Sequence, residues 1–284
     1  MTKDVGRSEL IQPRSVLVVV VTYFSESWIE ECIDHLRASA TELSITICVV
    51  DNDSGDSTAQ RAESLGVRVV QMGRNSGYSA AVNAGVEENA RHDFVLFMNP
   101  DVLVDENTVQ QLLEPFKNDD MVGATGPSLR SIDSNGSVAD HERCPSGRRC
   151  VSPITFALHW FLEERRPRNR FTTYYYNERR PQPPDNVDWL SGSCQMIRYD
   201  LWASIGGMDE KYFMFFEDVS LGLAVRRHGF RNAVLPGASV QHALGASVAR
   251  QTKTWKLRRH IGGAAVFYAT DYWFHVTQRL RTRS

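Results

Sequence analysis

The chain has 284 residues, of which 42% are hydrophobic and 23% are charged, as in ordinary globular proteins that bury a core. The formal net charge of -2 excludes a protein that binds nucleic acid through an overall positive charge. The five cysteines form neither a disulfide framework nor a C-x-x-C metal motif, which indicates a reducing compartment. No apolar stretch is long enough for a membrane span, and residues 1–14 lack the apolar run of a signal peptide, so we expect a cytoplasmic protein.

Strands and helices alternate through the first half of the chain. Residues 1–15 are polar and irregular, and we expect them to be disordered. Buried strands are predicted in the run 15–23 and at 45–50, further strands at 67–71 and 93–98, and helices at 27–39, from about residue 57, and at 79–90. This alternation predicts an α/β fold with a mainly parallel, twisted sheet and helices on both faces. Ligands bind such sheets beyond the carboxyl ends of the strands, where Thr22, Asp51 and Asp101 are expected to converge.

The second half of the chain is less regular. Residues 128–186 contain turn residues, an arginine-rich patch and an aromatic cluster, which predict a mobile excursion over the site. Further elements are predicted at 187–197 (strand), 201–205 (helix), 217–227 (helix) and 232–235 (strand). We therefore expect one catalytic domain at 16–249, with a nucleotide-binding half at 16–127 and an acceptor half at 128–249, followed by a basic helical tail at 250–284.

The tail has an unusual charge. Residues 250–284 contain eight Lys or Arg and a single acid, Asp271. Such a segment is suited to anionic lipid headgroups or to a lipid diphosphate, which predicts a peripheral membrane contact. A solvated basic helix without a partner explains the charge equally well. The aromatic residues of the tail either pack against the catalytic domain or enter the membrane.

Several polar residues stand where chemistry is expected. Asp101 follows a buried strand, where a carboxylate can bind a Mg²⁺ or Mn²⁺ ion that bridges phosphate oxygens, although Asn99-Pro100-Asp101 is also an ordinary turn. His242 is a candidate second ligand or a structural histidine. Glu217 and Asp218 begin a helix, whose dipole favours ionised carboxylates, and Asp218 can act there as a general base. The alternative is that both acids only stabilise the helix.

The donor side has weaker signals. Asp51 ends the second strand, where its carboxylate can accept hydrogen bonds from a base or a ribose. Asn75, Gly77 and Asn83 can offer backbone and amide groups to a nucleotide, although turn formation alone explains Asn75-Ser76-Gly77.

A series of motifs carries a family resemblance. They are Thr22-Tyr23, Val49-Val50-Asp51-Asn52, Asn75-x-Gly77-Tyr78 with Asn83, Phe97-Met98-Asn99-Pro100-Asp101, Gly206-Gly207-Met208-Asp209-Glu210 and Phe215-Phe216-Glu217-Asp218. In this order and spacing they resemble family 2 glycosyltransferases of the GT-A fold, and among these the bacterial and mycobacterial rhamnosyltransferases. The resemblance covers residues 16–242.

The resemblance implies roles for individual residues. Asp101 corresponds to the last acid of the metal-binding D-x-D motif, His242 to a late histidine that joins the metal in related enzymes, and Asp218 to the catalytic base, with Glu217 orienting the acceptor. It implies nucleotide-sugar contacts at Thr22, Tyr23, Asp51, Asn75, Gly77, Asn83 and Asn99, and it puts Trp189 and Gly192 where donor sugar and acceptor meet. Asn99 replaces the first acid of D-x-D, so we expect weaker metal binding, with the substrate diphosphate completing the coordination.

The predicted function is an inverting transfer of L-rhamnose from dTDP-rhamnose to a hydroxyl of a lipid-linked or polysaccharide acceptor, in cell-envelope glycan synthesis at the inner face of the membrane. A divalent cation, Mg²⁺ or Mn²⁺, is the expected cofactor. Two alternatives stay open. Asn99 favours a non-catalytic nucleotide-sugar or glycan-binding module of the same fold. A sugar-phosphate nucleotidyltransferase shares the core but usually has a glycine-rich basic loop after its first strand, and residues 22–27 contain no Gly, Lys or Arg.

Overall fold

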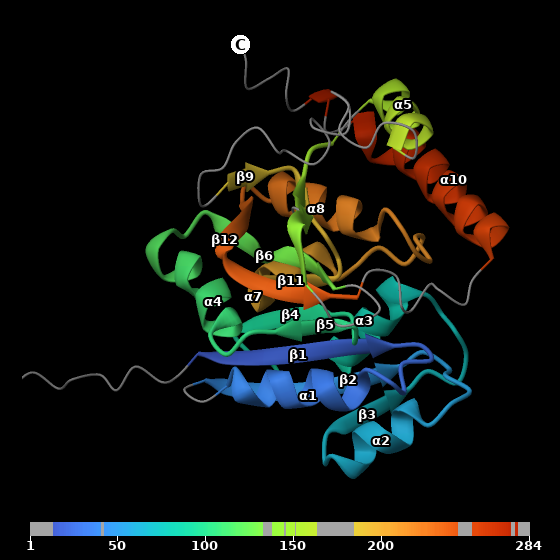
Figure 1. Cartoon of the computed structure of the whole chain (residues 1–284). Helices are drawn as coiled ribbons and strands as arrows, with labels where there is room; N and C mark the ends of the chain where they lie inside the picture. The colour runs from blue at the N-terminus through green and yellow to red at the C-terminus, as the bar shows by residue number, and fades with distance from the viewer. Residues whose placement is uncertain are drawn as a thin grey trace, which may run out of the picture.

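A computed structural model describes residues 14–40, 43–132, 138–144, 146–150, 152–163, 185–243, 252–273 and 276–277 (Figure 1). The predicted disorder of residues 1–15 falls largely outside these ranges, although Ser15 is already the first residue of a strand. None of the helices in the described ranges is long and apolar enough to cross a bilayer.

The first half of the chain forms the predicted alternation of strands and helices. Its elements are β1 (Ser15–Thr22), α1 (Ile29–Ala38), β2 (Ser44–Asp51), α2 (Thr58–Ser64), β3 (Arg68–Gln71), α3 (Tyr78–Glu87) and β4 (Phe94–Met98). β2 and β4 pair with β1, and β3 pairs with β2, all in parallel. The carboxyl ends of these strands therefore lie at one edge of the sheet.

The second half adds antiparallel strands to the same sheet. Its elements are β5 (Val102–Val104), α4 (Thr108–Asn118), β6 (Val122–Ile132), β7 (Val138–Cys144), β8 (Gly147–Arg148), α5 (Pro153–Glu163), β9 (Asp185–Val187), β10 (Trp189–Leu190), β11 (Cys194–Arg198), α7 (Tyr199–Ile205), α8 (Glu217–Arg227), β12 (Arg231–His242) and α10 (Lys253–Thr270). The main sheet has the order β3-β2-β1-β4-β11-β6-β12-β5. β11 runs antiparallel to β4 and β6, while β12 runs parallel to β6.

Both faces of β1 are buried, which explains its uninterrupted run of apolar residues. Val16, Val18 and Val20 pack with residues of α1 and α4 on one face. Leu17 and Val19 pack with residues of α3, α7 and α8 on the other. A third, smaller cluster joins α8 to α10 and contains Phe216 and Phe267.

The structure differs from the predictions in four places, the first being residues 102–127, where β5, α4 and the start of β6 were not predicted. The expected excursion at 128–186 contains the end of β6, the strands β7 and β8 and the helix α5 within its described residues. The predicted strand at 187–197 is divided into β9, β10 and β11, with Ser191, Gly192 and Ser193 between the last two. The predicted strand at 232–235 continues to His242 as β12, and its pairing with β6 shifts register between Leu235 and Ser239. The bulge there accommodates a proline and a glycine that otherwise signal a turn.

Candidate active site

A cavity of about 270 Å³ lies at the carboxyl ends of β1 and β4, where the sequence predicted the ligand site. Its walls are Val21, Thr22, Tyr23, Asn52, Asn75, Tyr78, Asn99, Asp101, Arg148, Ser191, Gly192, Ser193, Met214, Phe215, Glu217, Asp218 and His242. Nine of the predicted site residues belong to this set, which brings together the acids of two separate segments, Asp101 and the Glu217–Asp218 pair. Asp51, Gly77, Asn83 and Trp189 are not among the residues that line the cavity.

The acid pair at the start of α8 forms one wall. The backbone N–H of Gly192 donates to Asp218 Oδ2 at 3.2 Å, and the N–H of Val219 donates to Asp218 Oδ1 at 2.8 Å. Burial raises the pKa of Asp218, while Arg148 and these two backbone donors oppose the rise. Burial also raises the pKa of Glu217, and the neighbouring charge of Asp218 adds to that rise. These effects favour the proton of the pair on Glu217 and the negative charge on Asp218.

The loop before these acids has an uncommon backbone. Phe215 and Phe216 have φ angles of 68° and 74°, a left-handed conformation that bulky residues rarely adopt. The ring of Phe216 packs on Phe156 of α5 and on Phe267 of α10, each with centroids 5.4 Å apart. The ring of Phe215 lies 3.7 Å from that of His260 on α10. Helices α5 and α10 thus support the loop from which Glu217 and Asp218 follow.

The lining also contains an acid and a histidine that lie next to each other. His242 pairs with Val102 in the register between β12 and β5, which puts its side chain beside Asp101. Nε2 of His242 lies 3.5 Å from Oδ1 of Asp101, and both side chains are buried. Within the described residues neither ring nitrogen of His242 has a hydrogen-bond partner.

An imidazole nitrogen and a carboxylate oxygen that face each other in this way can act as two ligands of a divalent cation. The described ranges contain no group of three or more His, Cys, Asp or Glu side chains that could hold a metal ion. Two described side chains, Asp101 and His242, could therefore bind such an ion, with its other ligands coming from water or a substrate. Asn99 lines the cavity, and its backbone N–H donates to the carbonyl of Ser193 at 3.0 Å.

The part of the cavity wall that follows β2 is organised by Asn52 rather than by Asp51. Asp51 is buried and accepts hydrogen bonds from the Thr22 hydroxyl at 3.1 Å and from the Ser54 N–H at 3.0 Å, so it supports the cavity wall from behind. Asn52 lines the cavity and donates through Nδ2 to Asn75 Oδ1 at 3.2 Å. A hydrogen bond between these two amides fixes the turn that precedes α3.

Three other predicted contacts lie outside the cavity wall and have structural partners. Gly77 has a φ of +90°, and a Cβ there would come within 2.5 Å of the Phe213 carbonyl oxygen, so only glycine fits. The Asn83 amide donates to the carbonyl of Met208 at 2.9 Å and accepts from its N–H at 2.9 Å. Trp189 is buried, with the Arg148 guanidinium 5.0 Å from its ring centre.

Sequence reasoning missed Tyr78 and Arg148 as site residues. The Tyr78 hydroxyl donates to the carbonyl of Gly192 at 2.7 Å, so it fixes the residue that holds Asp218. Arg148 reaches the cavity because β8 pairs with β10, Arg148 opposite Trp189. Tyr78 stood within a quoted motif, whereas nothing in the sequence distinguished Arg148 from the other arginines of its patch.

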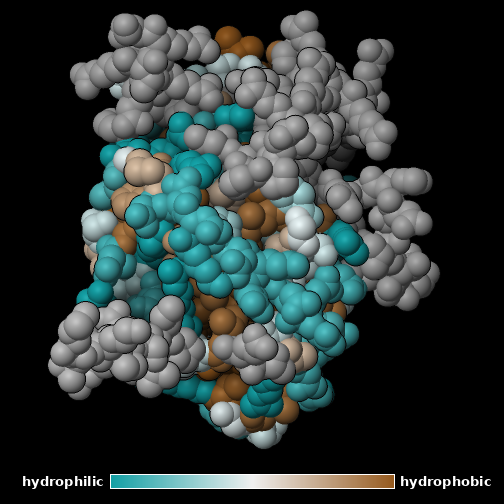
Figure 2. All heavy atoms as spheres, turned by 90° about the vertical axis from the view of Figure 1, so that its left-hand side faces the viewer, coloured by the Kyte–Doolittle hydropathy of each residue, from teal (hydrophilic) through white to brown (hydrophobic). Residues whose placement is uncertain are grey.

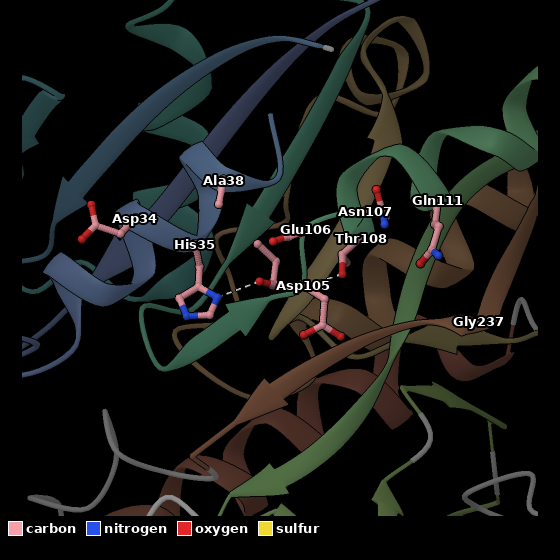
Figure 3. A pocket seen from close by; sticks show the side chains of 10 residues that line it. Asp34, His35, Ala38, Asp105, Glu106, Asn107, Thr108, Gln111 and Gly237 are labelled. Carbon is pink, nitrogen blue, oxygen red and sulfur yellow. Dashed lines mark hydrogen bonds between the residues drawn. The ribbon is translucent and has the colours of Figure 1, made fainter. Parts of the chain in front are cut away.

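A larger cavity of about 680 Å³ lies elsewhere, between α1 and the start of α4 (Figure 3). Its polar groups serve the fold: Nδ1 of His35 is 2.8 Å from the carbonyl oxygen of Val104, and the Thr108 hydroxyl donates to the Ser239 carbonyl at 3.0 Å. Its charged lining residues, Asp34, Asp105 and Glu106, are all acidic, and its described lining contains no Lys or Arg that could contact a phosphate, whereas the first cavity has Arg148. The cavity at the strand ends is therefore the better candidate.

Comparisons with known proteins identify the family of the chain. Residues 17–204 match the family described as Glycosyl transferase family 2. The N-acetylglucosaminyl-diphospho-decaprenol L-rhamnosyltransferase of Mycobacterium tuberculosis is 33% identical over 280 residues, covering 94% of this chain and 88% of the relative. Rhamnosyltransferase WbbL of Escherichia coli (strain K12) is 21% identical over 80% of this chain and 83% of its own length. The mannosyltransferase PcManGT of Pyrobaculum calidifontis, solved with GDP-Man and Mn²⁺, superposes with a TM-score of 0.61 at 18% identity over 92% of this chain and 66% of that chain. The chain therefore belongs to glycosyl transferase family 2, and it is a glycosyltransferase with the GT-A fold.

Proposed function

We propose that this enzyme transfers L-rhamnose, with inversion at the anomeric carbon, from dTDP-rhamnose to a hydroxyl of a lipid-linked acceptor in cell-envelope glycan synthesis. The names of the Mycobacterium tuberculosis and Escherichia coli relatives support the sugar, and the first of them supports a polyprenyl diphosphate acceptor. The observation that carries the chemistry is that one cavity joins the Glu217–Asp218 pair to the Asp101–His242 pair.

Asp218 is the proposed general base. The acceptor hydroxyl gives its proton to the Asp218 carboxylate while its oxygen attacks the anomeric carbon, and the bond from that carbon to the diphosphate breaks with its electron pair on the departing oxygen. The hydrogen bonds from Gly192 and Val219 orient the carboxylate. Since burial favours a protonated Glu217, this residue is the proposed donor of a hydrogen bond that orients the acceptor.

The charge of the cavity supports a divalent cation. Three acids line it, Asp101, Glu217 and Asp218, while Arg148 is the one Lys or Arg among its described lining residues. This surplus of negative charge opposes a diphosphate unless a further positive charge is bound. Asp101 and His242 would hold a Mg²⁺ or Mn²⁺ ion, which would supply positive charge to balance the leaving diphosphate. We propose that Thr22, Tyr23 and Asn75, with Asn52, bind the nucleoside, and that Arg148 contacts the diphosphate.

The test compares Asp218→Asn with Asp200→Asn, the same chemical change at an exposed residue of α7 outside the cavity. Transfer of radiolabelled rhamnose to a short-chain N-acetylglucosaminyl diphosphate lipid should fall by about a thousandfold or more in the first variant and remain in the second. Both variants should keep the thermal stabilisation that dTDP and Mn²⁺ give. Transfer at the original rate by Asp218→Asn would refute the mechanism. Stabilisation by UDP- or GDP-sugars in preference to dTDP-rhamnose would refute the donor.

A lipid-linked acceptor requires the enzyme to work at a membrane surface. We therefore propose a cytoplasmic enzyme that attaches peripherally to the inner face of the cell membrane. The division into a nucleotide-binding half at 16–127, an acceptor half at 128–249 and a tail remains a prediction. It is supported by the acid pair in the second half and by the donor-side residues in the first.

A further inference from the structure

Exposed hydrophobic side chains gather on two helices. The described part of the chain has five large hydrophobic side chains that are exposed, and four of them lie on α5 or at α10: Ile154, Leu158, Ile261 and Trp273. Ile154 is 74% exposed and Trp273 is 63% exposed. The fifth is Met121, which follows α4 elsewhere in the fold.

The two helices lie side by side at the right of Figure 1. The ring of Phe156 on α5 lies 6.2 Å from that of Tyr268 on α10, and both rings contact Phe216. Their exposed residues therefore belong to one surface. The side of the molecule away from α10 is mostly hydrophilic over its coloured residues and shows only small, separate hydrophobic patches (Figure 2).

From Ile261 onward, α10 has an apolar stripe on its outward side. Ile261, Ala265, Ala269 and Trp273 are all exposed, and their spacing of four residues puts them on one stripe of the helix. Between Lys253 and Thr270 the helix contains four Lys or Arg and no acid. Lys253 and Arg258 are exposed near its start. Apolar side chains, a terminal tryptophan and cations without acids are the features of a helix that lies in a membrane interface.

We infer that α5 and α10 form the membrane-binding surface of the enzyme and that its occupant is a bilayer with anionic headgroups. Ile154, Leu158, Ile261 and Trp273 enter the interface, and the cations at the start of α10 contact lipid phosphates. The inference rests on the proposed function for the lipid-linked acceptor. A second copy of the chain is a poorer occupant, because two copies of α10 would bring cations together without acids to pair with them.

This surface is connected to the catalytic acids. Phe216 packs beneath both helices, and Glu217 and Asp218 follow it directly in the chain. A lipid whose hydrocarbon chain stays in the bilayer can therefore present its sugar close to Asp218. The arrangement also explains why the loop at the acids is made of phenylalanines that are covered by α5 and α10.

The experiment measures sedimentation of the full chain with vesicles of phosphatidylcholine, alone or mixed with an equal amount of phosphatidylglycerol. We expect binding to the anionic vesicles. The triple variant Ile154→Ser, Ile261→Ser, Trp273→Ser should lose at least about tenfold in its partition coefficient, since each apolar side chain that leaves the interface weakens it. Met121→Ser removes an equally exposed hydrophobic side chain from another face and should bind as the original chain does. Thermal unfolding checks that both variants are folded.

Two results would overturn the inference. One is unchanged vesicle binding by the triple variant, and the other is a loss of the same size in Met121→Ser. A change of the triple variant from dimer to monomer on a sizing column, without a change in vesicle binding, would assign the surface to a second copy instead. Transfer to a water-soluble, short-chain acceptor separates this inference from the proposed function. It should be unchanged in the triple variant, and its absence from the original chain would count against the function but not against the surface.

Discussion

Two adjacent glycines of α10 have opposite surroundings, and this contrast gives a signed prediction. A Cβ added at Gly263 would lie 2.9 Å from the carbonyl oxygen of Phe215 and 2.9 Å from a ring carbon of Phe216, closer than real Cβ contacts. A Cβ added at Gly262 would meet no atom within 4 Å. The perturbation is therefore an alanine at each position in turn, with Gly262→Ala as the matched control.

The gain in helix propensity is the same for both variants, whereas the cost of overpacking applies only to Gly263→Ala. Replacing glycine by alanine inside a helix stabilises by about 1 kcal/mol. Gly263→Ala also forces apart two packed segments, and such overpacking costs about 1–3 kcal/mol. Gly262→Ala should therefore be more stable than the original chain, and the two variants should differ by about 1–3 kcal/mol. At roughly 3 °C per kcal/mol for a domain of this size, their Tm values should differ by about 3–9 °C.

Activity gives an independent measurement. The atoms that Gly263→Ala displaces belong to Phe215 and Phe216, which precede the proposed base, and a misplacement of about 1 Å can cost a hundredfold in rate. We expect a fall of roughly tenfold to a hundredfold in kcat for Gly263→Ala and an unchanged kcat for Gly262→Ala, both measured with a water-soluble acceptor. Equal Tm values and equal kcat values for the two variants would refute the contact between α10 and the catalytic loop.

Three further predictions concern charge. Asp271→Asn should lower the free energy of unfolding at pH 7 by about 2 kcal/mol, measured with urea, because a buried carboxylate that accepts from Tyr212 and Lys211 is lost. Burial alone would raise the pKa of Asp271, but its hydrogen bonds outweigh burial and lower this pKa. The difference in unfolding free energy between the variant and the original chain should therefore disappear as the pH falls through the pKa that Asp271 has in the folded state. Burial raises the pKa of Asp218, and a general base must be deprotonated to act. As the pH is lowered, kcat should therefore begin to fall at a higher pH than it would with an aspartate of ordinary pKa. His242→Ala should raise the Mn²⁺ concentration for half-maximal activity at least about tenfold, and an unchanged requirement would count against this ligand.

The fold was predictable where each strand is buried on both faces. β1, β2 and β4 appear in the sequence as short apolar runs, and the helices between them fix parallel pairing. α4 was not predicted, and it has Pro115 in its last turns. β12 was predicted too short, because Pro236-Gly237 indicates a turn unless a neighbouring strand supplies the pairing beyond it. Such pairing depends on residues far away in the chain, which a local pattern does not contain.

The residues of the site were predictable where they stand at the ends of predicted strands or helices. Residues at the ends of predicted strands or helices, such as Thr22 and Asp218, line the cavity as their positions suggested. The sequence favoured Asp51 over Asn52, but the last residue of β2 faces Thr22 and the next residue faces the cavity. Arg148 depends on the antiparallel pairing of two short strands, one of them inside a segment that looked irregular. Long-range pairing, rather than composition, decided which arginine reaches the acids.

The phenylalanines before the acids have a second role beyond making the surroundings apolar. A left-handed conformation costs roughly 1–2 kcal/mol for each of Phe215 and Phe216, and glycine at these positions would avoid that cost. Burying the ring of Phe216 against α5 and α10 returns about 2 kcal/mol or more, which glycine could not provide. The strained loop therefore persists because the C-terminal helix covers it. It follows that the inner face of α10, with His260, Gly263 and Phe267, holds the loop before the base in place, while the residues on its outer face do not contact that loop.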